Sequence, residues 1–129
     1  MRASKMNKKR PKHLALHLIK LPLPGMVSIL HRVSGLLLFL VLPLLLWTLQ
    51  YSLHSGENFA FLSWMFSHPA SKLFLLLVLW AFLHHFCAGL RYLAIDLHWL
   101  GSISQARNSS KIVLLVSLSL TIIFGVKLW

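Results

Sequence analysis

Residues 33–53 read VSGLLLFLVLPLLLWTLQYSL, a run of 21 residues without a formally charged side chain. A helix rises 1.5 Å per residue, so about 20 apolar residues cross the roughly 30 Å hydrocarbon core of a bilayer. This run is long enough to span a membrane outright. It predicts a transmembrane helix over about residues 26–53.

Two further apolar runs follow, from Leu73 to Leu90 and from Ile112 to Val126. The second run spans a bilayer if it uses a few flanking residues. The third is short unless Lys127 extends its side chain to the far interface. We therefore expect an all-α integral membrane protein whose three helices run up, down and up. The expected parts are a basic segment over residues 1–25 and a transmembrane domain over residues 26–129, with spans at about 26–53, 71–96 and 110–129.

The composition excludes several classes of protein. Of 129 residues, 57% are hydrophobic and 12% are charged, and the 13 basic residues outnumber the 2 acids to give a net charge of +11. A soluble domain has about a quarter of its residues charged, and a disordered chain needs low hydrophobicity. Nucleic-acid-binding modules do not expose this much apolar surface. The scarcity of acids also leaves little material for a self-contained hydrolytic site.

The basic residues predict the orientation in the membrane. Eight of them lie in residues 1–32, three in residues 91–111, and none in the 51–70 connection. Loops rich in Lys and Arg stay on the cytoplasmic side. We expect the N-terminus and the 91–111 connection to be cytoplasmic, and the 51–70 loop and the C-terminus to be periplasmic.

A short apolar segment over residues 13–23 precedes the first span. We expect it to lie at the membrane interface and to be broken by Pro22 and Pro24, since proline interrupts a helix.

Ionisable groups inside a span are costly and therefore mark candidate sites. At 100° per residue, His85, Gly89, Tyr92 and Asp96 fall within about 40° of one line on the second helix. A histidine with glycine one turn away suits a flat cofactor lying against the helix, and imidazole is a common axial ligand of haem iron.

The adjacent His84 points about 100° away, on a line with Ala88, Arg91 and Ile95. The geometry favours His85 as the ligand, with His84 as the alternative. A second interpretation stays open, in which both histidines bond to neighbouring helices. The lone Cys87 is interpreted as a small packing residue.

The start of the first span carries a second polar cluster. Ser28 and Arg32 are four residues apart and share a face, which His31 borders. The antiparallel topology brings this cluster to the same membrane edge as Arg91 and Asp96. Such a set suits haem propionates or a quinone carbonyl. The alternative is that both arginines only anchor the chain at the cytoplasmic interface.

Three sequence elements together resemble one family, the cytochrome b subunits of succinate dehydrogenase (respiratory complex II). They are Arg10-Pro11, Ser28-Ile-Leu-His31-Arg32-Val-Ser34-Gly35 and His85-x-x-x-Gly89-Leu-Arg91-x-x-x-x-Asp96. The resemblance covers nearly the whole chain, including its length, its three spans and the order of the motifs.

The resemblance implies a membrane-anchor subunit that is not an enzyme by itself. It would pair with a second membrane anchor and hold the iron–sulfur and flavoprotein subunits. One haem b would lie between the two anchors, each giving one axial histidine. The subunit would help electrons pass from the iron–sulfur subunit to ubiquinone. We expect no nucleic-acid partner, only these subunits and membrane lipid.

The resemblance also implies residue roles. His85 matches the axial ligand, and Ser28 and Arg32 match the ubiquinone-site residues. His31 and Arg32 match the region near the haem propionates, while the roles of Tyr92 and Asp96 are left open. Arg91 is also expected near the propionates, because the topology brings it to the same membrane edge. The sequence departs from the family pattern where His84 precedes His85 and where Tyr92 replaces the histidine of many relatives.

Two rival functions follow from the same residues. The chain would be a haem-free anchor of a fumarate reductase-like complex if His85 binds no iron. A small transporter or assembly subunit would use the histidines for protons or a metal. The Arg10-Pro11 element lies close to Met1, which favours a bacterial inner membrane over a mitochondrial location.

Overall fold

The computed structural model describes residues 21–128, which form four helices. Residues 1–20 hold most of the expected basic segment and of the expected interfacial segment, and both expectations lie largely outside the described residues. The helices are α1 (Leu23–His54), α2 (Gly56–Ser67), α3 (Pro69–Asp96) and α4 (Ile103–Val126).

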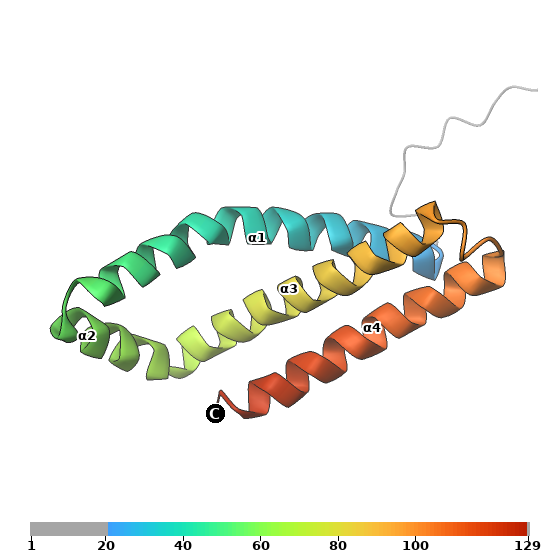
Figure 1. Cartoon of the computed structure of the whole chain (residues 1–129). Helices are drawn as coiled ribbons and strands as arrows, with labels where there is room; N and C mark the ends of the chain where they lie inside the picture. Colours follow the sequence, from blue (N-terminus) through green and yellow to red (C-terminus); the bar gives the residue numbers. More distant parts are fainter. Residues whose placement is uncertain (1–20, 129) are drawn as a thin grey trace, which may run out of the picture.

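Three of these helices, α1, α3 and α4, are long and apolar enough to cross a membrane. Even α4, with 24 residues, reaches about 36 Å at the usual helical rise. They run side by side (Figure 1), with α2 joining α1 to α3 at one end of the bundle and the α3–α4 connection at the other. This arrangement confirms the predicted all-helical architecture with three spans.

The first helix begins earlier than expected. Pro22 is its N-cap and Pro24 lies in its first turn. The amide groups of a first turn have no partner inside the helix, so proline is tolerated there. Both prolines therefore lie at the start of α1, which begins three residues before the expected start near Met26. Most of the interfacial segment that they were expected to interrupt lies outside the described residues.

The last helix also begins before its predicted start at residue 110. The Ser102 hydroxyl accepts a hydrogen bond from the Gln105 amide at 3.1 Å, and the Gln105 side chain accepts one from the Ser102 amide at 3.0 Å. This capping box satisfies two free amides and starts the helix at Ile103. The third span is therefore not short, although its helix ends at Val126.

The 51–70 connection was expected to be a loop, and this was wrong. It contains α2, whose N-cap Ser55 accepts a hydrogen bond from the Asn58 amide at 3.1 Å. His68 ends α2 and caps α3, where its Nδ1 accepts from the Ala70 amide at 3.3 Å.

The helices pack closely through small side chains. Ser34, Ser110 and Ser117 are almost fully buried, and each donates its hydroxyl proton to a carbonyl of its own helix. Gly125 lies so near α3 that an added Cβ would fall 2.6 Å from Leu76 Cδ2. Helices in membranes approach each other through such small residues.

The outside of the bundle is strongly apolar. Phe39 and Leu40 on α1 expose 72% and 63% of their surface, and most other large apolar residues are also exposed. In a membrane protein this surface faces lipid or another subunit rather than water.

Candidate functional site

The His85 side chain lies against the first half of α1. Its ring stacks on the His31 ring with centroids 4.2 Å apart and planes 10° from parallel. An added Cβ on Gly35 would lie 2.8 Å from His85 Cε1. Only glycine at residue 35 therefore leaves room for this imidazole between the two helices.

Hydrogen bonding fixes the orientation of the His85 ring. Its Nδ1 lies 3.1 Å from the His31 carbonyl oxygen and 3.5 Å from Ser34 Oγ. The Ser34 hydroxyl donates its own proton to that carbonyl at 2.9 Å. Because a carbonyl only accepts, Nδ1 is the donor in this contact, and in the neutral ring Nε2 then carries the lone pair. Histidines that ligate metals are typically held in this way by their second nitrogen.

Tyr92 and Gly89 extend the same face of α3. The Tyr92 ring lies 5.2 Å from the His31 ring at an angle of 52°, and an added Cβ on Gly89 would lie 3.9 Å from His31 Nε2. The Tyr92 hydroxyl is buried and has no hydrogen-bond partner among residues 21–128. Three residues of the predicted stripe, His85, Gly89 and Tyr92, thus border one residue of α1, His31. The fourth, Asp96, has no such contact among those found in the described residues.

The neighbouring His84 has different surroundings. It is fully buried and stacks on Trp80, with ring centroids 5.3 Å apart. The Val27 backbone comes near its ring, but within the described chain neither ring nitrogen has a partner in hydrogen-bond geometry. The two adjacent histidines therefore differ sharply, since His85 is oriented by α1 and His84 points into the bundle.

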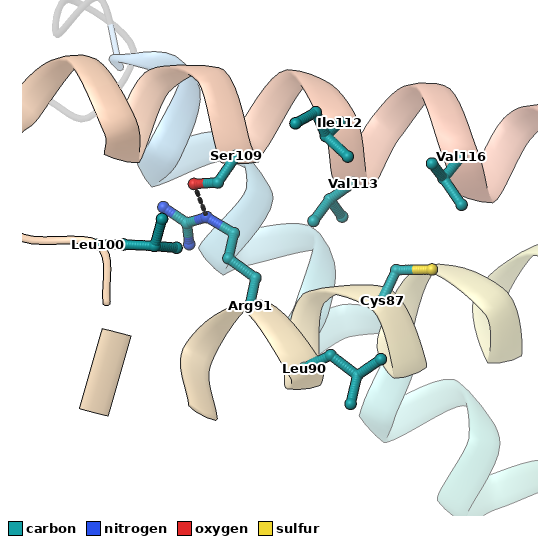
Figure 2. Close-up of a pocket in the computed structure, with 8 residues that line it drawn as sticks. All are labelled: Cys87, Leu90, Arg91, Leu100, Ser109, Ile112, Val113 and Val116. Atoms are coloured by element: carbon teal, nitrogen blue, oxygen red, sulfur yellow. Dashed lines mark hydrogen bonds between the residues drawn. The ribbon is translucent and has the colours of Figure 1, made fainter. Parts of the chain in front are cut away.

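The structure separates the remaining candidates. Ser28 is half-buried and Arg32 is exposed, both in the first three turns of α1. Asp96 is exposed at the last position of α3. Arg91 is buried and points toward α4, where Nε donates to Ser109 Oγ at 3.0 Å (Figure 2). The structure thus places His31 beside both His85 and Tyr92 and directs Arg91 to another interface.

Sequence reasoning gave no role to Ser34 and Gly35, although both belong to the first motif. Ser34 lies within reach of His85 Nδ1, and Gly35 makes space for the ring. The signal was a serine–glycine pair one turn after His31, a combination that marks close helix packing.

These residues fit a haem. The described residues contain no cluster of three or more metal-binding side chains. Haem needs no such cluster, because its macrocycle supplies four nitrogen ligands and the protein adds axial ones. A single imidazole with a free Nε2, and a glycine one turn further along α3, meet this need.

Comparison with known proteins shows the family of this chain. A family model described as "Succinate dehydrogenase/Fumarate reductase transmembrane subunit" matches residues 6–124. The chain is similar to the succinate dehydrogenase cytochrome b556 subunit of Coxiella burnetii (strain RSA 493 / Nine Mile phase I), with 38% identity over 96% of this chain and 100% of the relative.

Subunits of the same name are similar in two other bacteria. The Paracoccus denitrificans protein is 31% identical over 88% of both chains. The Rickettsia felis (strain ATCC VR-1525 / URRWXCal2) protein is 30% identical over 92% of both. The chain therefore belongs to the succinate dehydrogenase cytochrome b556 family, as a multi-pass membrane-anchor subunit of the succinate dehydrogenase complex.

Proposed function

We propose that this subunit binds haem b through His85 and ubiquinone through Ser28 and Arg32. The observation that carries the haem part is the bond between His85 Nδ1 and the His31 carbonyl, because it leaves Nε2 as a ligand atom. Haem, when bound, supplies a one-electron carrier. The similar proteins are cytochrome b556 subunits by name, which supports the same assignment.

The quinone part of the proposal rests on the α1 residues. Ser28 donates a hydrogen bond to a quinone carbonyl, and Arg32 places a positive charge beside the ring oxygens. Reduction to quinol needs two electrons and two protons, and a fixed cation stabilises negative charge on those oxygens until the protons arrive. Arg32 is exposed in this chain, so its guanidinium is available to a ligand outside it.

The subunit would act together with the other subunits of the complex. A second membrane anchor would supply the other protein ligand of the haem, and the iron–sulfur and flavoprotein subunits would deliver electrons from succinate. The distribution of basic residues supports a cytoplasmic N-terminus, a periplasmic C-terminus and a bacterial inner membrane. His31 and Arg32 of α1 would offer hydrogen-bond donors to the haem propionates. Arg91 was also expected there, but its side chain points toward α4.

The test compares His85→Leu with His84→Leu in the purified complex. We expect His85→Leu to abolish or shift the visible b-type absorption bands and His84→Leu to keep them. Gel analysis of all subunits separates haem loss from failed assembly. If only His84→Leu removes the bands, His84 is the ligand. If the unmodified complex shows no b-type bands, the chain is a haem-free anchor.

A further inference from the structure

Arg91 is a buried cation at the interface of α3 and α4. Only 6% of its surface is exposed. Its Nε donates to Ser109 Oγ at 3.0 Å and its Nη2 donates to the Ala106 carbonyl at 3.2 Å. Both acceptors are neutral, and a guanidinium has five N–H groups. These contacts orient Arg91 without balancing its charge.

The chain offers little to balance that charge. It contains only two acids. Asp96 is exposed at the end of α3, and Glu57 lies in the first turn of α2, at the opposite end of the bundle (Figure 1). Among the residues that the structure describes, none of the contacts of Arg91 involves a carboxylate. A buried charge without a partner is costly, so the complementary anion must come from outside this chain.

An apolar groove of about 230 Å³ begins at this guanidinium. Arg91 and Ser109 lie at its polar end, beside Leu100 of the α3–α4 connection (Figure 2). From there the lining is almost entirely apolar and continues along both helices to Cys87 and Val116. The groove therefore has the form that fits an amphiphile, with a cation at one end and an apolar channel leading away.

The depth of Arg91 in the membrane matches a lipid headgroup. It lies five residues before the end of α3, and Ser109 lies six residues after the start of α4. These offsets correspond to about 8–9 Å along the helix axes. Headgroups occupy a layer of several Å on each side of the roughly 30 Å hydrocarbon core.

We propose that this groove binds an anionic glycerophospholipid. The phosphate meets the remaining N–H groups of Arg91, and one acyl chain lies between α3 and α4. Guanidinium and phosphate form strong charge-assisted hydrogen bonds, and basic pockets between transmembrane helices select anionic headgroups. Six residues separate Arg91 from His85, which turns the two side chains about 120° apart on α3. The proposed phosphate position therefore lies on another face of α3 than His85. The Arg91 guanidinium carbon is also 5.3 Å from the centroid of the Tyr92 ring, which borders His31, so haem content is counted beside lipid in the test.

The test measures lipid retained by the complex. The wild-type complex and its variants are reconstituted in nanodiscs of phosphatidylcholine with phosphatidylglycerol, then transferred to mild detergent. Mass spectrometry counts phosphatidylglycerol per complex, and absorption spectra of the same samples count haem. We expect Arg91→Gln to weaken phosphatidylglycerol retention about fivefold, the usual contribution of one cation near an anionic headgroup.

Two further variants make the test specific. Val116→Phe keeps Arg91 and Ser109 but fills the groove, and we expect the same loss of phosphatidylglycerol. Lys111→Gln removes an exposed charge at the same depth of α4, outside the groove, and we expect wild-type retention. Inorganic phosphate in the buffer should not replace the lipid.

Three results would overturn the proposal. Retention could fall equally in Lys111→Gln, which would show a diffuse charge effect. Phosphatidylglycerol retention could stay unchanged in Val116→Phe, which would show that no lipid occupies the groove. This variant remains a test even if Arg91→Gln fails to assemble. A loss of haem without a loss of lipid in Arg91→Gln would assign Arg91 to the haem propionates instead.

Discussion

The two interfaces of α3 use polar side chains in opposite ways. At the α1 interface, the His85 imidazole is held through Nδ1, so that Nε2 is the nitrogen left to act as a ligand. At the α4 interface, a charged guanidinium is buried and bonded to neutral oxygens of the neighbouring helix. Polar side chains within a membrane span can therefore either present a ligand atom or join two helices. Substitutions at the first interface should change the spectrum and the activity, whereas those at the second should change stability.

The largest effect is expected for Arg32→Leu on α1. Succinate:quinone reductase activity should fall about 100-fold, the usual cost of removing a group that stabilises developing negative charge. Electron transfer from succinate to an artificial acceptor, which takes electrons before they reach the quinone site, should stay near the wild-type rate. Assays of both activities on one preparation check this, and an equal loss of both would indicate failed assembly.

Gly35→Ala should have the next largest effect. Its methyl group would lie 2.8 Å from His85 Cε1, too close for any ordinary contact. Overpacking of this kind costs about 1–3 kcal/mol, so we expect lower haem content and an altered absorption spectrum. Gly25→Ala is the matched control, because its nearest neighbours lie at 3.8 Å. Identical spectra for both variants would contradict the assigned position of His85.

Ser109→Ala tests the second interface. It removes the acceptor of Arg91 Nε and leaves a buried donor unpaired, which costs about 1–3 kcal/mol. We expect a lower unfolding temperature of the complex with an unchanged haem spectrum. Ser119→Ala, at an exposed position of the same helix, should change neither quantity. A spectral change in Ser109→Ala would mean that the two interfaces are coupled.

The smallest effect is expected for Gly125→Ala, far from both sites along α4. The added methyl group meets Leu76 Cδ2, the end of a flexible side chain that is able to move. We expect a loss of about 1 kcal/mol or less in stability. Adding Leu76→Ala to Gly125→Ala should remove the clash, and a double-mutant cycle of unfolding temperatures measures that coupling.

Hydropathy predicted the three spans because length and the absence of charge are properties of the chain alone. It did not predict α2, since a 12-residue helix is too short to produce a spanning signal. The predicted start of α4 was also too late, because the charges of Arg107 and Lys111 interrupt the apolar run. Ser102 and Gln105 are the local signal that was available, because a serine followed three residues later by glutamine typically begins a helix.

The site was predicted in part. Helical periodicity correctly placed His85, Gly89 and Tyr92 on one face, and it placed Arg91 with His84 on another. The expectation that Arg91 lies near the haem propionates came from the antiparallel topology, which brings it to the same membrane edge as Arg32, and it stays a prediction. Periodicity did not reveal that His31 and Ser34 orient the His85 ring, because residues 54 and 51 positions apart meet only when α1 packs on α3.

The sequence by itself determined that the chain spans a membrane three times, and it ordered the polar residues around each helix. Both follow from the rise and the rotation per residue, which every helix shares. The neighbours that each helix face contacts depend on how the helices pack in the tertiary structure. This packing placed Gly35 beside His85, left His84 inside the bundle and turned Arg91 toward Ser109. The physical reason is that steric fit and hydrogen bonding between helices depend on distances that no single helix contains.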